Sequence, residues 1–348
     1  METLWFWLVS VMIAIYVVMD GFDFGAGILH LVVAKTNEER RQVLGAIGPL
    51  WDGNEVWLLA GGGSLFLAFP KVLASGFSGF YLAMWLVVWS LMLRGISIEF
   101  RSHVQDGLWR HFWDATFAVS SVLLPVLLGA ALGNVLRGVP LDATGYFSMP
   151  LWTDFQLGPQ PGILDWYTVL IGVFALVTVT AHGALFLAWK TEGPVHLRAK
   201  HLAPRLWLLV LVCWVAASAA TARVNPSILH NLPGAPLAWI AILLYLAGLG
   251  LVFLGLGRER YLLAFLGSGA FILGLLAASA ACVFPVMLRS TLNPACDLTA
   301  LNASVGGHGL RTGLVWWLLG FPLALGYVAF LFRFHRGKVV AAEEGEGY

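Results

Sequence analysis

The feature that most constrains this chain is the recurrence of apolar stretches long enough to cross a lipid bilayer. A transmembrane helix needs about 20 consecutive, mostly apolar residues, and such stretches follow one another along all 348 residues. Hydrophobic residues make up 59% of the sequence and charged residues 11%, which is far from the composition of a soluble globular domain. The sequence therefore predicts an all-α polytopic membrane protein.

Nine apolar segments can be drawn between joints that are charged or rich in proline and glycine. They cover approximately residues 4–33, 50–69, 73–97, 113–136, 163–189, 206–222, 236–257, 261–286 and 312–332. The first segment is too long for a signal peptide, so we expect it to stay as the first span. We expect one transmembrane domain over residues 1–335, built as two four-helix bundles plus a peripheral ninth helix, and a short acidic tail at 336–348.

The basic residues give an expected orientation. Alternate joints and the C-terminal tail collect 15 of the 20 Lys and Arg residues. The other five are Lys71, Arg137, Arg223, Arg289 and Arg311. Because cytoplasmic joints are enriched in Lys and Arg, we expect the N-terminus outside and the C-terminus in the cytoplasm.

Pairs of small residues four positions apart occur in several of the expected spans. Gly21 with Gly25 and Gly129 with Gly133 have the spacing that lets two membrane helices approach closely. Such spacing is common in membrane helices. It therefore predicts close packing at these positions and no particular chemistry.

Four carboxylates lie within or beside the apolar stretches as two pairs of equal spacing. The pairs are Asp20 with Asp23 and Asp52 with Glu55. Residues three apart share a helical face, and the expected topology puts both pairs in the cytoplasmic half of the membrane. Ionisable groups at this depth are costly and mark an ion or proton path by default.

Two readings of these acids stay open. Two acids close together in a low dielectric cannot both stay ionised cheaply, so each pair is expected to hold and exchange a proton, as a proton relay requires. Alternatively, the acids accept bonds from backbone N–H groups, Trp indoles or Arg and never exchange protons. Asp52 is the strongest proton-path candidate, whereas Asp20 could serve as a cap or turn in the glycine-rich segment.

Three charged residues lie at the end of the third apolar segment or just after it. Arg94 ends the apolar run, and we expect it to be the counter-ion of a buried acid. Glu99 is either a proton entry point or a solvated loop acid. Arg101 is interpreted as a basic flank that reaches the headgroup region.

No metal-binding or catalytic motif is found. His182 lies within the fifth apolar segment, where a lone histidine is expected to be a hydrogen-bonded packing residue; a haem iron held by His182 and a methionine stays open but is not favoured. Cys213, Cys282 and Cys296 lack metal-ligand spacing. The net charge of +1 argues against a nucleic-acid partner.

Several joined motifs carry a family resemblance. They are DGFDFGAG (Asp20 to Gly27), GPLWDGNEVWLLAGGGSLFLAFP (Gly48 to Pro70), FSGFY (Phe77 to Tyr81), LRGISIEFRS (Leu93 to Ser102), GNVLRGVP (Gly133 to Pro140) and VFPVMLRSTLNP (Val283 to Pro294). With these motifs the chain resembles subunit II of cytochrome bd-type quinol oxidases. The resemblance covers essentially the whole chain and is strongest over the first 140 residues.

The resemblance implies a terminal oxidase of the prokaryotic cytoplasmic membrane that oxidises quinol and reduces O2 to water. It implies that subunit I carries the b and d haems and the redox catalysis, while subunit II is haem-free, supports assembly and helps to supply protons from the cytoplasm. Asp52 and Asp23 then match the family's proton-path acids, and Arg94 and Glu99 match a charged group near them. The family also allows a structural quinone, bound lipid and a small single-span accessory subunit.

Two other functions compete with this one. A proton-coupled secondary transporter would also use buried acids and glycine-interrupted helices, but no clear similarity between the two halves of the sequence supports it. A purely structural scaffold subunit is the second alternative. It would use the same acids to hold helices together.

Overall fold

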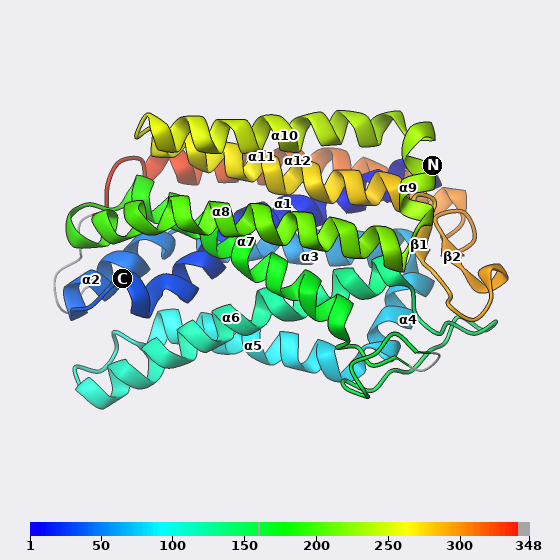
Figure 1. The fold of residues 1–348 in the computed structure, drawn as a ribbon, viewed down its shortest axis with the longest axis horizontal. Coiled ribbons are helices and arrows are strands. Elements are labelled where there is room, and N and C mark those ends of the chain that lie inside the picture. The colour runs from blue at the N-terminus through cyan, green and yellow to red at the C-terminus, as the bar shows by residue number, and fades with distance from the viewer. Residues whose placement is uncertain (159–160, 340–348) are drawn as a thin grey trace.

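The computed structural model describes residues 1–158 and 161–339 (Figure 1). These residues form twelve α-helices, two short 3-10 turns and one two-stranded antiparallel sheet. Eight of the helices are long and apolar enough to cross a membrane, and the number rises to nine if one sharply bent pair counts as a single span. The predicted all-α polytopic fold is confirmed.

The helices and strands follow one another in a simple order. They are α1 (Glu2–Val33), α2 (Asn37–Ile47), α3 (Trp51–Ala68), α4 (Pro70–Gly79), α5 (Tyr81–Phe100), α6 (Gly107–Arg137), α7 (Trp166–Lys190), α8 (Gly193–Val224), α9 (Ser227–Asn231), η1 (Leu232–Gly234), α10 (Pro236–Gly257), α11 (Tyr261–Val283), β1 (Val286–Leu288), η2 (Pro294–Cys296), β2 (Leu298–Thr299) and α12 (Gly307–Phe334).

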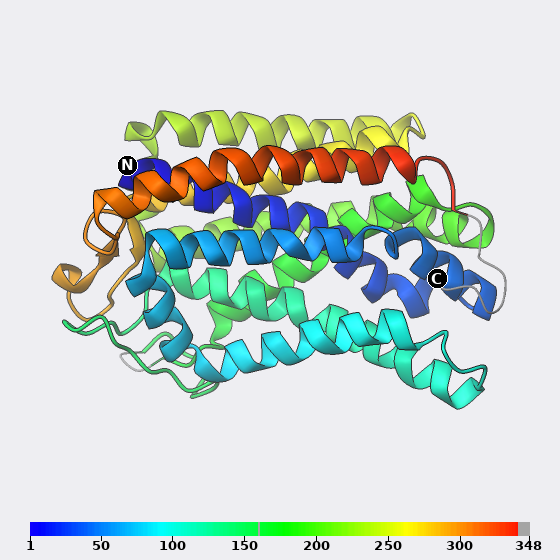
Figure 2. The ribbon, with the colours of Figure 1, turned by 180° about the vertical axis from the view of Figure 1, so that it is seen from behind.

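Helix α1 is central and packs against α3, α6, α7 and α11 (Figures 1 and 2). On one side α5 packs on α6, and on the other α8 packs on α7 while α10 packs on α11. The two expected four-helix groups correspond to α1, α3, α5 and α6 and to α7, α8, α10 and α11. They meet where α1, α6 and α7 pack together. Helix α12 lies against α3 and is the least covered of the spans, in its expected peripheral place.

Glycines set the closest helix crossings. Gly25 of α1 meets Gly183 of α7, and a Cβ atom on either residue would collide with the backbone of the other helix. In α6, a Cβ on Gly129 would lie 2.7 Å from the Cβ of Ala175 in α7, and Gly133 faces the same helix. The predicted close packing is thus confirmed at Gly25, Gly129 and Gly133.

The prediction that the third apolar segment forms one helix over residues 73–97 is wrong. Its first residues belong to α4, which forms a bent pair with α3, and the rest belong to α5. Helices α3 and α4 are bent by 116° at Phe69, which precedes Pro70. A proline disfavours helical geometry in the residue before it, and Phe69 has φ −136° and ψ 60°. The backbone N–H of Val305 donates to the Ala68 carbonyl at 3.1 Å and satisfies part of the broken helix end.

Other helix limits also differ from the expected segments, and at α7 a local cap explains the difference. Helix α7 begins at Trp166 and not at 163, since the Asp165 carboxylate accepts bonds from the backbone N–H groups of Tyr167 and Thr168. Helix α8 begins at Gly193 and carries a polar first part that hydropathy does not reveal. Helix α11 ends at Val283, before β1, and α12 begins at Gly307.

The bundle has two distinct ends (Figure 1). At the end near the N-terminus, which we call the loop end, the long connections join one another. There the N–H of Val139 donates to the Arg289 carbonyl at 2.9 Å, and Asn225 Nδ2 donates to the Leu136 carbonyl at 2.7 Å. The opposite end, which we call the α2 end, holds α2 and residues 335–339.

Candidate functional site

The candidate site is built around Arg94, near the α2 end of α5. Its side chain is fully buried, and its Nη1 lies 2.7 Å from Oδ1 of Asp20, which is also fully buried, on α1. Its Nη2 lies 3.7 Å from Oε2 of Glu55 on α3. The guanidinium also lies over the Phe24 ring, 4.7 Å from its centroid. Arg94 therefore ties three helices together, and its predicted role as counter-ion of a buried acid is confirmed.

Asp23 lies one helical turn along from Asp20 but has a different partner. It is buried, and Asn54 Nδ2 donates to its Oδ2 at 2.8 Å. Asn54 lies between Asp52 and Glu55 in the sequence and is itself buried in α3. Of the two buried acids on α1, Asp20 thus faces a cation and Asp23 a neutral amide.

Helix α1 is continuous from Glu2 to Val33, so the expected cap or turn at Asp20 is wrong. The glycines of the DGFDFGAG segment do not break the helix. Because Gly25 allows α7 to approach closely, these glycines are explained by packing. Asp20 is held within a helix interior by its ion pair with Arg94.

The acids of the second pair lie at a groove between α3 and α5. The groove has a volume of about 360 Å³, and its lining includes Asp52, Glu55 and Glu99 together with Trp51. Asp52 and Glu99 are exposed, whereas the Glu55 side chain is 25% exposed. The two acids predicted to share a helical face do share this groove.

Glu55 connects the groove to the buried ion pair. Its carboxylate both lines the groove and lies within ion-pair distance of Arg94, which in turn contacts Asp20. The six residues predicted from the sequence therefore form one connected region in the half of the bundle nearer the α2 end. Its outer part is three carboxylates open to the surroundings, and its inner part is a buried arginine between acids of two helices.

A second buried polar cluster was missed by the sequence interpretation. Asp114 of α6 is buried, and its carboxylate lies 2.6 Å from His30 Nε2, 2.6 Å from Arg101 Nε and 2.9 Å from Arg40 Nη1. The interpretation of Arg101 as a snorkelling flank is wrong, because its side chain is 2% exposed and bonded to Asp114. The available signal was an acid, in WDATF, at the start of an apolar run.

His182 is fully engaged by protein groups. Its Nδ1 lies 2.5 Å from the Ser268 hydroxyl, and its Nε2 lies 3.0 Å from the Val18 carbonyl. The ring also stacks on Phe265, with centroids 4.7 Å apart. The described residues contain no group of three or more His, Cys, Asp or Glu side chains that could hold a metal ion.

The fold and site define a polytopic helical membrane protein with an acidic groove that leads to a buried arginine–carboxylate pair. A family model for cytochrome bd terminal oxidase subunit II matches residues 1–335. The chain belongs to that family.

Individual relatives agree with this assignment. The chain is 30% identical over 342 residues to cytochrome bd ubiquinol oxidase subunit 2 of Bacillus subtilis, covering 97% of each chain. It is 37% identical over 214 residues to cytochrome bd-I ubiquinol oxidase subunit 2 of Escherichia coli K12, a match that covers 62% of this chain and 55%, about half, of the relative.

A solved structure shares the fold. A chain in the structure of bd oxidase from Geobacillus thermodenitrificans superimposes with a TM-score of 0.76 at 17% sequence identity, covering 96% of this chain and 98% of that chain. At this identity the similarity shows the arrangement of the helices alone.

Proposed function

We propose that this chain is the haem-free subunit II of a bd-type terminal oxidase that couples quinol oxidation to the reduction of O2 to water. In this role it supports assembly with a haem-bearing subunit I and conducts protons toward it. The family match over residues 1–335 supports the assignment to such a complex. The observation that carries the proton role is the position of Glu55, which joins an open acidic groove to a buried ion pair.

The α2 end is proposed to face the cytoplasm of a prokaryotic cell, with the chain in the cytoplasmic membrane. The joints assigned to this side carry 15 of the 20 basic residues, and cytoplasmic segments are enriched in Lys and Arg. With this orientation the acidic groove draws protons from the cytoplasm.

The groove carboxylates provide the first steps of the proposed path. Asp52 and Glu99 are exposed and take protons from water, and Glu55 passes them inward. Arg94 is a counter-ion for the ionised form of Glu55, so this carboxylate can release a proton without being left as an unpaired charge. Arg94 holds Glu55 and Asp20 in register, and it keeps its own proton because a guanidinium does not deprotonate in proteins.

Asp23 is proposed as the inner acceptor of the path. It is buried beside Asp20 on the same helix face, and its partner Asn54 supplies a neutral hydrogen bond. An amide can donate to the ionised carboxylate and does not compete for the proton. Asp23 can therefore change its charge without losing its position.

His182 is already held by protein groups and is not free to bind a haem iron. Both ring nitrogens of His182, the histidine considered as a ligand, bond to protein groups. We therefore assign the b and d haems and the quinol-oxidising chemistry to subunit I. A structural quinone and a small single-span accessory subunit remain part of the proposal as partners of the assembled complex.

Substitutions in the assembled complex test the proton role. Asp52→Asn, Glu55→Gln and Asp23→Asn remove one proton-exchanging group each and keep its shape. We expect normal haem content in the complex and quinol oxidase turnover lowered about a hundredfold, the low end of the contribution of a positioned proton-transfer group. Glu38→Gln is the matched control, because Glu38 is an exposed acid at the same end and does not line the groove.

The scaffold alternative predicts a different result. If all three variants assemble with full haem content and keep wild-type turnover from pH 6 to pH 9, the acids are structural and the proton role is wrong. If a purified, intact complex of this chain contains no haem-bearing partner, the oxidase assignment is wrong.

A further inference from the structure

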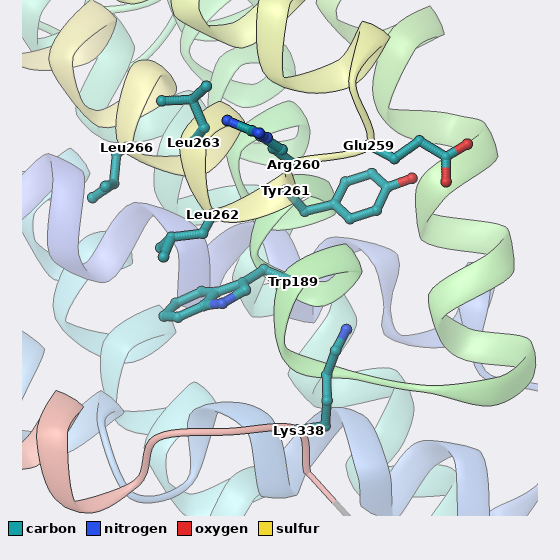
Figure 3. A pocket seen from close by; sticks show the side chains of 8 residues that line it. All are labelled: Trp189, Glu259, Arg260, Tyr261, Leu262, Leu263, Leu266 and Lys338. Carbon is teal, nitrogen blue, oxygen red and sulfur yellow. The ribbon is translucent and has the colours of Figure 1, made fainter.

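A second cavity lies at the α2 end, on the other side of the bundle from the acidic groove. Its volume is about 540 Å³, and it is an open pocket bordered by the last turn of α7, the start of α11 and the segment after α12 (Figure 3). Its lining combines two cations, two aromatic rings and three leucines. The proposed proton path uses none of these residues.

The positive charge of this pocket comes from Arg260 and Lys338. Lys338 Nζ donates to the Thr191 carbonyl at 2.9 Å, which fixes the ammonium at the end of α7. Arg260 is exposed and immediately precedes the first turn of α11. Neither side chain has an ion pair with a carboxylate among the residues that the structure describes. Two cations without an ion pair among these residues therefore line the pocket, on opposite sides of Leu262 and Trp189 (Figure 3).

The acid that also lines the pocket is already neutralised. Glu259 Oε1 lies 2.9 Å from Lys200 Nζ on α8. In Figure 3 its carboxylate points away from Trp189 and Lys338. Glu259 thus leaves the positive charge of Arg260 and Lys338 in place.

The opposite side of the pocket is apolar and continues along α11. Leu262 and Leu266 are 44% and 58% exposed and lie one helical turn apart, so they form a strip that runs from the pocket toward the middle of the span. Trp189 forms the floor between this strip and Lys338 (Figure 3). An indole of this kind is favoured at the level of lipid headgroups.

We propose that this pocket binds one anionic phospholipid. The phosphate lies beside Lys338, Arg260 adds positive charge on the opposite side of the pocket, Trp189 packs against the glycerol region, and an acyl chain follows Leu262 and Leu266. Basic pockets between spans at the cytoplasmic side recognise anionic headgroups in this way. A soluble anion would leave the exposed leucine strip unused, and a neutral ring such as a quinone would leave both cations unpaired.

Native mass spectrometry of the intact delipidated complex tests the proposal. The complex is titrated with dioleoyl phosphatidylglycerol, with dioleoyl phosphatidylcholine and with glycerol 3-phosphate. We expect the first site for phosphatidylglycerol to weaken at least tenfold in the Arg260→Gln/Lys338→Gln double variant. The matched control is Arg258→Gln/Arg336→Gln, which removes two exposed cations at the same end that do not line the pocket; its affinity stays within twofold of wild type.

Three outcomes overturn the proposal. Equal loss in the double variant and in the control would show general attraction to a basic surface. Equal binding of glycerol 3-phosphate would show a free-anion site, and equal binding of phosphatidylcholine would remove the role of the cations. A tenfold gain of phosphatidylglycerol affinity after truncation at Val339 would assign the pocket to the acidic residues 340–348.

Leu266→Ser gives a second measure that does not depend on charge. It shortens the apolar strip at an exposed position, so the complex is expected to fold normally. The affinity for dioleoyl phosphatidylglycerol should fall about threefold, while that for a short-chain dihexanoyl analogue should stay unchanged. An unchanged affinity for both lipids would contradict the proposed path of the acyl chain.

Discussion

The two buried polar clusters of this protein are opposites in charge. Around Arg94, a cation contacts Asp20 and Glu55, with Asp23 close by. Around Asp114, a carboxylate contacts Arg101, Arg40 and His30. The first cluster therefore has more acids than cations, and the second has more cations than acids.

The difference decides which cluster can exchange protons. A carboxylate left without a cation can take up a proton and become neutral, whereas an arginine cannot lose its proton. The cluster around Arg94 also reaches an open groove through Glu55. The cluster around Asp114 has its carboxylate bonded on both oxygens and is suited to hold α1, α2, α5 and α6 together.

The largest expected effect is that of Asp114→Asn. It leaves the buried Arg101 and the partly buried Arg40 without their counter-ion. Neither arginine can become neutral by losing a proton. Breaking a buried pair in this way costs about 3–5 kcal/mol. We expect a lower yield of complex and a lower melting temperature in detergent. Normal stability would show that the two clusters do not differ as described.

The next effect is that of Arg94→Gln, which leaves Asp20 buried without its cation. We expect a loss of up to about 3 kcal/mol at pH 8. Because Asp20 can be neutralised by a proton when folded, the loss should be smaller at pH 5. Thermal unfolding of the variant and wild type at both pH values measures this. A loss independent of pH would mean that Asp20 cannot accept a proton.

Asp23→Asn should separate stability from activity. It replaces a carboxylate that bonds to an amide with a neutral group of the same shape. We expect the unfolding free energy of the complex to change by no more than about 1 kcal/mol, while quinol oxidase turnover falls about a hundredfold. Reduced stability with unchanged turnover would reverse the assignment of Asp23.

The smallest effect is expected for an ion pair that is partly exposed to solvent, which serves as a comparison for both buried clusters. Arg198 Nη1 lies 2.6 Å from Glu39 Oε2 at the start of α2. Burial raises the pKa of Glu39, but the bonds from Arg198 and from the N–H groups of Lys35 and Thr36 outweigh it, so the pKa is lowered. The stabilisation is therefore present at neutral pH and is lost as the pH falls through the lowered pKa.

Glu39→Gln should consequently cost about 0.2–1 kcal/mol at pH 7. The cost should disappear at a pH below the pKa of Glu39, where the wild-type carboxylate is protonated as well. Melting curves at pH 7 and at a series of successively lower pH values follow this loss. A loss as large as that of Asp114→Asn would mean that burial does not set the difference between these pairs.

Much of the candidate site could be predicted from the sequence, because charged residues inside apolar runs stand out. Asp20, Asp23, Asp52, Glu55 and Arg94 were found in this way. Their partners could not be found, since spacing within one helix does not say which helix lies opposite. Asn54 and Asp114 illustrate this limit: one is an uncharged residue, and the other lies at the start of an apolar run, where an acid appears ordinary.

The sequence by itself determined that the chain is a bundle of membrane-spanning helices with its acids toward one end. The length of an apolar run and the positions of Lys and Arg are properties of single segments. They can therefore be recognised without knowing which helices contact one another. Only the tertiary structure decided that Arg94 pairs with Asp20 rather than Asp23, that Glu55 joins the groove to this pair, and that Arg101 is buried against Asp114. These choices depend on helix crossings such as that of Gly25 with Gly183, where backbone contact between distant segments sets which side chains meet.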